Sequence, residues 1–176
     1  MRKNFGKKTY LYPMPVLIVA AYDAEGTPNA MNAAWGGISE DHKTTANILA
    51  SGAFSVSVAD AEHVTECDYV GVVSGNDQPN KLAKAGLHTE KSAFVNAPVL
   101  VELPMALECR LKSYDAESCR LVGEIVNVSA DVRVLDEEGR IDPARLRPIT
   151  YDPVGHRYIE LGATVGRAFH DGLALK

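Results

Sequence analysis

Residues 107–134 read LECRLKSYDAESCRLVGEIVNVSADVRV, and this stretch is the strongest indicator of the chain's architecture. Residues 107–112 alternate apolar and charged side chains, and residues 126–134 carry Val or Ala at every second position. Alternation with a period of two is typical of a β-strand with one buried face. The acidic turn at residues 115–118 joins the two runs, so we expect a long antiparallel hairpin. Strands longer than about 5–6 residues normally curl around a barrel.

Outward from this hairpin, the sequence predicts short strands and short helices. Residues 15–22 (PVLIVAAY) are β-branched and apolar between turn formers, which indicates a strand buried on both faces. Residues 53–58 alternate Phe and Val with Ser, which indicates a strand with one buried face. The remaining predicted elements are helices at 42–52, 59–70 and 79–85 and a late strand at 158–162. The pattern predicts a mainly β fold, an antiparallel barrel with a few short helices.

Length and composition favour one ordinary globular domain over residues 1–176. The chain has 176 residues, a formal net charge of −5 and 46% hydrophobic residues. No basic run is visible that would suit a nucleic acid backbone, so we expect no nucleic-acid partner. No stretch approaches the roughly 18 apolar residues that span a bilayer, so we expect no membrane segment.

The cysteine pattern and the N-terminal residues both favour a cytoplasmic location. The three cysteines are an odd, scattered set without metal or disulfide spacing, which indicates reduced thiols. Basic residues precede the apolar run 16–21, which is the order of a signal peptide. Pro13 and Pro15 interrupt the approach to this run, however, and a turn follows it directly, so a buried strand is the better interpretation.

Several enzyme signatures are missing from the sequence. It contains no GxSxG, GxxxxGK[ST] or GxGxxG motif, which argues against a serine hydrolase elbow, a P-loop and a Rossmann domain. His63 and Cys67 would share a helix face, but two ligands are too few for a metal site. We therefore assign no metal and no catalytic side chain.

Three segments carry residues suited to a phosphorylated, flat ligand. Lys43-Thr44-Thr45 opens a predicted helix, where free N–H groups and two hydroxyls favour a phosphate; ordinary capping is the alternative. Residues 73–77 form a polar loop, followed by Lys81. Residues 29–37 (NAMNAAWGG) bring small side chains to the single Trp, where a flat ligand can approach the backbone; a Trp that fills the core is the alternative.

Taken in order from about residue 12 to residue 169, these pieces resemble the flavin reductase-like, FMN-binding split-barrel family, especially its flavoredoxin-type branch. The likeness is carried by PMPV at 13–16, NAMNAAW at 29–35, KTT at 43–45 with Asn47 and Ile48, and Ser74-Gly75 with Lys81-Leu82. It continues in Ala97-Pro98, LEC at 107–109, VGE at 122–124, Tyr151 and YIELG at 158–162. The resemblance implies a split barrel and a homodimer that holds FMN near the subunit interface.

The resemblance also assigns cofactor-binding positions. The isoalloxazine ring would lie along Asn29, Met31, Asn32, Ala33, Ala34 and Trp35. The phosphate would bind to His42, Lys43, Thr44 and Thr45. The site would also be lined by Ser74, Lys81 and Tyr151. Backbone N–H groups of the first segment, or Lys81, would stabilise negative charge at flavin N1 and O2. No protein nucleophile is required, since the flavin carries the chemistry.

Two positions depart from the family pattern. Ser118 stands where relatives often have His, which leaves no protonatable group there. Between Ile38 and His42 roughly ten residues are missing, and loss of a strand there would expose unpaired backbone edges. Either a segment is left out of the sequence or this chain rebuilds the site, and we expect the first.

Three functions are compatible with the sequence. The leading one is an FMN-dependent NAD(P)H oxidoreductase of the flavin reductase type, with hydride transfer to flavin N5. The second is a flavoredoxin-like electron carrier that uses a protein redox partner. The third is a non-catalytic dimeric barrel that binds another phosphorylated ligand.

Overall fold

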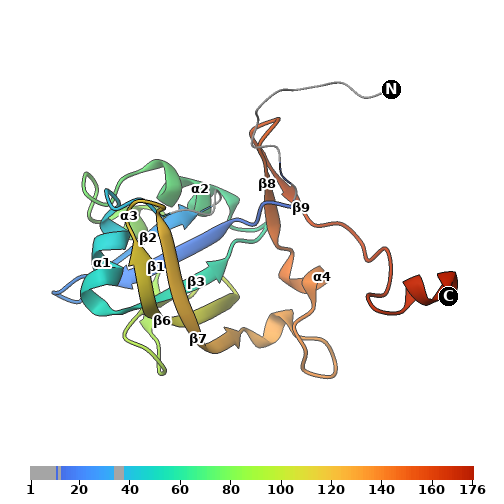
Figure 1. Cartoon of the computed structure of the whole chain (residues 1–176). Helices are drawn as coiled ribbons and strands as arrows, with labels where there is room; N and C mark the ends of the chain where they lie inside the picture. The colour runs from blue at the N-terminus through green and yellow to red at the C-terminus, as the bar shows by residue number, and fades with distance from the viewer. Residues whose placement is uncertain (1–10, 12, 34–37) are drawn as a thin grey trace.

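The computed structural model describes residues 11, 13–33 and 38–176. Its centre is a five-stranded antiparallel sheet with the order β2-β1-β3-β6-β7 (Figure 1). This sheet consists of β1 (Leu17–Tyr22), β2 (Pro28–Ala33), β3 (Ala53–Val58), β6 (Met105–Asp115) and β7 (Arg120–Ala130). Two further pairs of strands form small separate sheets: β4 (Thr89–Lys91) with β5 (Pro98–Leu100), and β8 (Ile149–Asp152) with β9 (Arg157–Glu160). The sheet ends at β2 on one side and β7 on the other, so it is open, as in a split barrel. The predicted fold class is confirmed.

The sequence predicted the burial of β1 correctly but not that of β3. The four inner residues of β1 are buried, which confirms a strand covered on both faces, although it begins at Leu17. In β3 the predicted single buried face is wrong, because Ser55 and Ser57 are buried as fully as Phe54. The Ser55 hydroxyl donates to the Pro98 carbonyl over 2.5 Å. A second, two-stranded sheet of β4 and β5 therefore covers the serine face.

The described structure has four short helices: α1 (Lys43–Ser51), α2 (Val64–Val72), α3 (Lys81–Lys84) and α4 (Pro143–Leu146). The first three contact strands of the sheet, whereas α4 packs against residues 132–134. α1 ends as predicted at Gly52, whose φ of 69° places it in the left-handed region. α2 begins later than predicted. The Asp60 carboxylate accepts hydrogen bonds from the backbone N–H groups of Glu62 and His63, which holds this stretch in a turn before the helix.

The β6–β7 hairpin matches the sequence prediction except at its end. Both strands have eleven residues, and the register shifts at two places, between Glu108 and Cys109 and between Leu111 and Ser113. β7 stops at Ala130 instead of Val134. The Asp131 carboxylate accepts a hydrogen bond from the Arg133 N–H, which turns residues 132–134 into a 3-10 helix.

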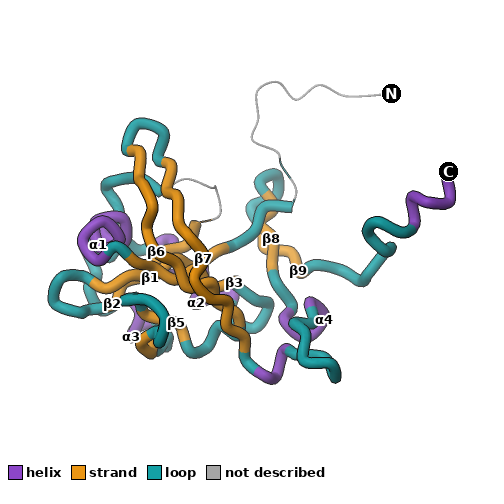
Figure 2. The backbone as a smooth tube through the Cα atoms, turned by 60° about the horizontal axis from the view of Figure 1, so that its bottom comes forward, coloured by secondary structure: helices purple, strands orange, loops and turns teal. Residues whose placement is uncertain are grey.

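The last part of the chain forms a separate hairpin and an extended segment (Figures 1 and 2). The β8–β9 hairpin joins the body at Met14, whose N–H donates to the Thr150 hydroxyl over 2.7 Å and whose carbonyl accepts from Tyr151 N–H over 2.8 Å. Residues 161–176 then lead away from the sheet and end in a short 3-10 helix. No helix in the described part of the chain is long and apolar enough to cross a membrane.

The described residues between Ile38 and His42 form a turn and no strand, and an omitted segment at this point stays a prediction. The backbone runs from Ile38 through a turn directly into α1. Ile38 N–H donates to the Cys119 carbonyl over 3.1 Å, and the Thr45 hydroxyl donates to the Ser39 carbonyl over 2.7 Å. These bonds fix the short connection to the β6–β7 turn and to α1, so the chain bridges this point without a further strand.

Candidate functional site

A cavity of about 250 Å³ lies where β2, the start of α1 and the end of α2 meet. Eight of the thirteen predicted site residues line it: Asn29, Met31, Asn32, His42, Lys43, Thr44, Ser74 and Lys81. They come from four segments that lie up to 52 residues apart (81 − 29) in the sequence. The fold thus brings the three separate predicted segments to one place.

Asn29 and Thr44 form the floor of this cavity. Asn29, only 2% exposed, donates from Nδ2 to the Thr44 hydroxyl over 2.7 Å, which ties β2 to the first turn of α1. Asn29 Oδ1 is buried and has no hydrogen-bond partner among the described residues. A buried acceptor without a partner is costly, so this oxygen is suited to a donor supplied by a ligand.

The end of α2 and the loop after it pack closely against β2 because residues 71 and 75 are glycines. A Cβ at Gly71 would lie 2.7 Å from the Asn32 Cβ, and a Cβ at Gly75 would overlap the Asn29 amide. Asn32 donates from Nδ2 to the Cys67 carbonyl over 3.2 Å, while its Oδ1 is a second buried acceptor without a described partner. The wall therefore presents backbone atoms and two unsatisfied amide oxygens.

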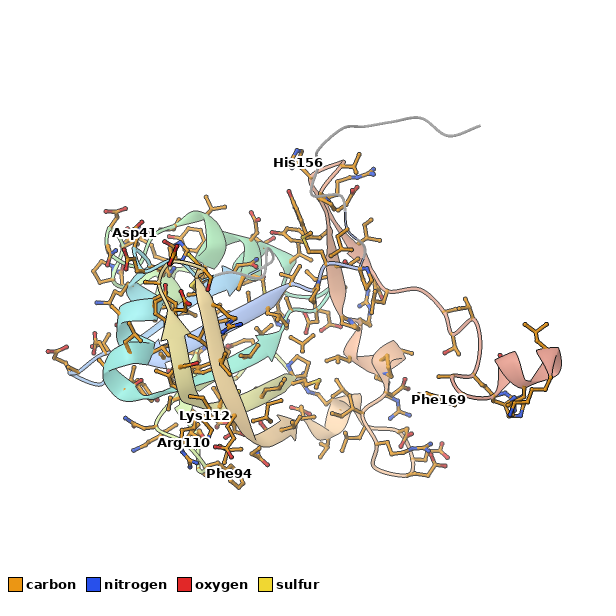
Figure 3. All side chains as sticks on the ribbon, in the orientation of Figure 1. Asp41, Phe94, Arg110, Lys112, His156 and Phe169 are labelled. Carbon is orange, nitrogen blue, oxygen red and sulfur yellow. The ribbon has the colours of Figure 1, made fainter. Side chains whose placement is uncertain are left out.

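The start of α1 provides the positive side of the cavity. The first turn of a helix has backbone N–H groups without intrahelical acceptors, and the helix dipole places partial positive charge there. Lys43 lies beside this turn and pairs with Asp23, with Nζ 3.7 Å from Oδ2. Asn76 Nδ2 donates to the Asp41 carbonyl over 3.2 Å, which joins the loop after α2 to the loop before α1. Asp41 marks this end of the molecule in Figure 3.

Lys81 borders the cavity, but its ammonium group points into the protein. Nζ donates to the carbonyls of Val70 over 2.9 Å and Val73 over 2.8 Å, and only 2% of the residue is exposed. These carbonyls belong to the last turn of α2, where a cation is favourable to the helix dipole. Burial lowers the pKa of Lys81 to about 8. The direct task of Lys81 in this structure is to close the end of α2.

The other predicted residues lie outside this cavity. Thr45 is fully buried and its hydroxyl bonds to Ser39, so it anchors α1. Ala33 faces an apolar pocket on the other side of the sheet. Tyr151 lies on β8, with its hydroxyl 2.8 Å from His156 Nδ1, and His156 is far from Asp41 in Figure 3. Ala34 and Trp35 fall outside the described residues.

The cysteines and histidines form no metal centre in the described structure. His63 Nδ1 lies 2.8 Å from Asp60 Oδ1, so this histidine pairs with Asp60. Burial raises the pKa of Cys67 to about 12, with smaller effects from Asp60 and Glu66. Among the described residues, no group of three or more His, Cys, Asp or Glu side chains is placed to hold a metal ion.

Several residues at the end of α2 and in the loop after it line the cavity without having been predicted as cofactor-binding residues. Val70, Gly71 and Val72 line the cavity but lie outside every predicted segment, whereas Val73 and Gly75 lie in the predicted polar loop 73–77 without having been named as cofactor-binding residues. Gly71 and Gly75 are four residues apart, a spacing at which two backbones can approach closely. That spacing, next to the Ser74 that was assigned, is the signal that could have identified this wall.

The open antiparallel sheet, with a polar cavity between the start of α1 and the end of α2, defines a protein of the split-barrel class. Residues 35–152, more than half of the chain, match the family described as Flavin reductase like domain, and the chain belongs to this family. This confirms the family predicted from the sequence.

Solved structures extend the likeness over the whole chain. Flavoredoxin of Desulfovibrio vulgaris (Miyazaki F) is 33% identical, with a TM-score of 0.92 over 98% of this chain and 100% of that chain. Flavoredoxin from Methanosarcina acetivorans is 24% identical, with a TM-score of 0.88 over 100% of both chains. An FMN-binding domain of a flavin reductases-like enzyme from Shewanella baltica OS155 is 23% identical, with a TM-score of 0.77 over 88% of this chain and 89% of that chain. FMN, the cofactor predicted from the sequence, is thus the flavin named for a structure of the same fold.

Among curated proteins, an uncharacterized protein of Aquifex aeolicus (strain VF5) is 29% identical over 111 residues. The match covers 60% of this chain and 55% of that relative. The chain therefore spans about half the length of the curated relative that it matches.

Proposed function

We propose that the chain is an FMN-binding flavoprotein oxidoreductase whose cofactor occupies the cavity between β2, α1 and α2. The observation that carries this proposal is the convergence of eight predicted residues on one cavity, two of which hold buried amide oxygens without described partners. The residues present fit FMN, because the cavity joins a phosphate-binding helix start to a wall of backbone and amide groups.

The phosphate of FMN would bind at the start of α1. The backbone N–H groups of the first turn, the Thr44 hydroxyl and the Lys43 ammonium converge there, and His42 precedes the helix. A phosphate would compete with Asp23 for Lys43, whose Nζ is 3.7 Å from that carboxylate. A helix N-terminus is a favourable site for a phosphate because the N–H groups and the helix dipole act together.

The ring system would lie along β2 and the end of α2. Asn29 and Asn32 would accept hydrogen bonds there with their unsatisfied Oδ1 atoms, and Gly71 and Gly75 let the backbone of α2 and its following loop approach these two side chains closely. When bound, FMN supplies hydride and single-electron chemistry. Ala33, Ala34, Trp35 and Tyr151 remain proposed ring neighbours on the strength of the family resemblance.

Lys81 would act on the flavin through the wall it holds in place. Its bonds to Val70 and Val73 fix the backbone that precedes Ser74 and Gly75. This replaces the expectation that its ammonium contacts flavin N1 or O2. The backbone N–H groups near β2 remain the candidates for stabilising negative charge at that edge.

The electron donor that we propose first is NAD(P)H, because the family is named for flavin reduction. A second candidate is a reduced redox protein, as for a flavoredoxin-like carrier. The similarity to the Desulfovibrio flavoredoxin over 98% of the chain favours this second candidate. A cytoplasmic location accords with both, since all three cysteines are free.

The proposal includes a homodimer, in which a second copy of the chain covers part of the cofactor. The cavity of about 250 Å³ is smaller than the usual 300–1,000 Å³ of a site that buries a cofactor-sized ligand, so a single chain encloses only part of FMN. A second copy near the cavity mouth would cover the remainder. The family resemblance places the flavin near such an interface.

Anaerobic absorption spectroscopy tests the proposal and separates the donors. We expect protein reconstituted with FMN to retain bands between about 350 and 500 nm after gel filtration, the signature of a bound flavin cofactor. Prompt bleaching with NADH or NADPH identifies the reductase, and bleaching only with dithionite or a reduced redox protein identifies the carrier. A protein that takes up no FMN would contradict both and leave another phosphorylated ligand as the alternative.

A further inference from the structure

A second cavity, of about 190 Å³, lies beside the turn that precedes α2, whereas the proposed flavin cavity lies at the other end of this helix. Its lining comes from segments far apart in the chain: the turn before α2, the connection between β5 and β6, and the residues on both sides of α4. In Figures 1 and 2, α4 lies at the side of the molecule away from α1. We call this cavity the arginine pocket, because Arg133, Arg145 and Arg147 line it.

Each arginine of the pocket is held by a carboxylate that does not line the pocket. The pairs are Arg133 Nε with Asp131 Oδ1, Arg145 Nε with Asp142 Oδ2, and Arg147 Nε with Glu160 Oε1, at 3.1, 3.6 and 2.9 Å. A side chain that is already held in place loses less conformational freedom when a ligand binds. The three guanidinium groups are thus positioned around one cavity by contacts on its outside.

These pairs leave N–H groups of the arginines for a ligand. A guanidinium group carries five N–H donors in a planar fork. Arg145 uses Nη1 to donate to the Leu135 carbonyl. Among the described residues, Nη1 and Nη2 of Arg133 and Nη2 of Arg145 have no hydrogen-bond partner. Paired N–H groups of this kind bind two oxygens of one phosphate at once.

Two of the three carboxylates that line the pocket already have other partners. Asp60, only 3% exposed, accepts hydrogen bonds from the N–H groups of Glu62 and His63, and its Oδ1 lies 2.8 Å from His63 Nδ1. Glu102 accepts a hydrogen bond from the His88 N–H over 2.8 Å, and its Oε1 lies 2.6 Å from His88 Nδ1. These two carboxylates are therefore committed to contacts outside the arginine cluster.

The third lining carboxylate, that of Glu62, competes directly with an anion. Its Oε1 lies 3.5 Å from Arg147 Nη1. Its charge also acts on Arg133, where it raises the pKa of the guanidinium after the larger effect of Asp131. Three guanidinium groups thus share one exposed carboxylate inside the pocket.

The size of the pocket suits a single small anion. About 190 Å³ is room for several waters of about 30 Å³ each, but it is less than the 300–1,000 Å³ of a site that buries a whole cofactor-sized ligand. The apolar lining residues Val134 and Leu146 are buried. An apolar surface beneath the guanidinium groups strengthens their attraction for a negative charge, because the local dielectric constant is lower.

We propose that the arginine pocket binds a phosphate group. Several guanidinium groups around one small cavity match a dianion with three or four oxygens better than a carboxylate with two. Two sources carry this chemistry: inorganic phosphate, and the 2′-phosphate that NADPH has and NADH lacks. α2 has nine residues and is about 13 Å long, so a nucleotide at the flavin cavity would reach the pocket along this helix. Only the nucleotide source rests on the proposed function.

Titration calorimetry with inorganic phosphate at constant ionic strength tests the pocket. The full chain is loaded with FMN, so that the proposed phosphate site at the start of α1 is filled. We expect Arg133→Gln and Arg145→Gln each to weaken phosphate binding by about tenfold, the effect of losing a hydrogen bond to a charged group. Glu62→Gln should tighten it, since the competing carboxylate is removed. Arg110→Gln is the control, because Arg110 pairs with Glu124 on the β6–β7 hairpin, outside the pocket.

The result for Glu62→Gln separates a binding role from a structural one, because loss of an ion pair alone cannot tighten phosphate binding. Circular dichroism confirms that each variant is folded. Phosphate binding that is equal in wild type, Arg133→Gln and Arg145→Gln would overturn the proposal. So would weaker binding in Glu62→Gln, or no binding of phosphate to the wild type.

Titration with NADP⁺ and NAD⁺, which cannot reduce the flavin, identifies the source of the phosphate. If the pocket holds the 2′-phosphate, wild type binds NADP⁺ more tightly than NAD⁺, Arg133→Gln loses this preference, and inorganic phosphate competes with NADP⁺. Equal affinities for the two nucleotides, together with phosphate binding that depends on the arginines, identify inorganic phosphate as the ligand.

A second titration, on FMN-free protein, keeps this inference separate from the flavin assignment. Phosphate then has two proposed sites: Lys43→Gln should weaken the one at the start of α1, and Arg133→Gln the one in the arginine pocket. Binding that survives Lys43→Gln and is lost when Arg133→Gln is added supports the pocket even in a protein that takes up no FMN. Retention of FMN with no arginine-dependent phosphate binding contradicts the pocket alone.

Discussion

Asn29 on β2 and Thr44 on α1 are joined by a buried hydrogen bond of 2.7 Å between Nδ2 and Oγ1. This bond connects the two segments that the sequence assigned separately to the flavin ring and to its phosphate. The same Asn29 side chain leaves its Oδ1 without a described partner at the cavity. The contact therefore fixes the relative positions of the ring-binding and phosphate-binding segments.

Thr44→Val should weaken both the fold and FMN binding. The change leaves the buried Asn29 amide without its acceptor, at a cost of about 1–3 kcal/mol in the free energy of unfolding. Urea denaturation measures the stability, and FMN titration measures the affinity. Thr45→Val is the matched control, since Thr45 is equally buried but bonds to Ser39 away from the cavity. Equal FMN affinities for the two variants would remove Thr44 from the site.

Gly75→Ala should lower FMN affinity by displacing Asn29. A Cβ at this position overlaps the Asn29 amide, so either the side chain or the loop after α2 has to move. We expect FMN affinity to fall by about tenfold or more, the range for loss of one good hydrogen bond to a ligand. Gly162→Ala is the control, because nothing lies within 4 Å of a Cβ there. Unchanged affinity in Gly75→Ala would show that this wall does not hold the cofactor.

The sequence predicted the sheet and the start of α1 because each has a local signal. The alternation in β6 and β7 and the apolar run of β1 depend on residues close together in the chain. Burial of Ser55 was not predictable in this way, since it depends on the Pro98 carbonyl 43 residues away. The same holds for β7, whose inward polar row is set by the distant pairing of Asn127 with Glu108.

Site prediction failed where a side chain's partner lies elsewhere in the chain. Lys81 was expected to face the ligand, but the end of α2 offers it two carbonyls inside the protein. Thr45 was expected to bind phosphate, but a helix directs successive side chains about 100° apart, and this one meets Ser39. Asn29 and Thr44, which do line the cavity, lie in two of the segments that their residue types already indicated, and the family resemblance then assigned them to the ring and the phosphate.

Lys81→Met should destabilise the end of α2 and the cavity wall with it. The carbonyls of Val70 and Val73 lose a shared donor, and we expect the free energy of unfolding to fall by about 1–3 kcal/mol. Hydrogen exchange should accelerate at residues 70–75 first. Lys84→Met, on the same helix but exposed, is the control. Normal exchange at 70–75 in Lys81→Met would contradict a role in closing the helix.

Glu108→Gln should remove a pH-dependent contribution to stability. Burial raises the pKa of Glu108, but hydrogen bonds from Ser92, Asn127 and Ser129 outweigh it, and the pKa lies below its ordinary value. The ionised carboxylate therefore contributes fully above about pH 4.5, and this contribution is lost as the pH falls through the lower pKa of the folded state. Wild type should be more stable than Glu108→Gln by a constant amount between about pH 5 and pH 7, and this difference in the free energy of unfolding should shrink below about pH 4.

Thermal unfolding across this pH range measures the difference. Glu117→Gln in the exposed β6–β7 turn serves as the control, since it removes the same charge at the surface. A stability difference that grows as the pH falls would show that the bonds from Asn127 and its neighbours do not favour the charged form of Glu108.

The most direct test of the flavin site compares the affinities for FMN and riboflavin, which differ only by the phosphate. We expect wild type to bind FMN at least about tenfold more tightly, since charge-assisted bonds at a helix start contribute about 1.5–3 kcal/mol. Lys43→Gln should weaken FMN binding and leave riboflavin binding unchanged. Equal affinities for the two flavins in wild type, or no binding of either, would contradict a cofactor held with its phosphate at the start of α1.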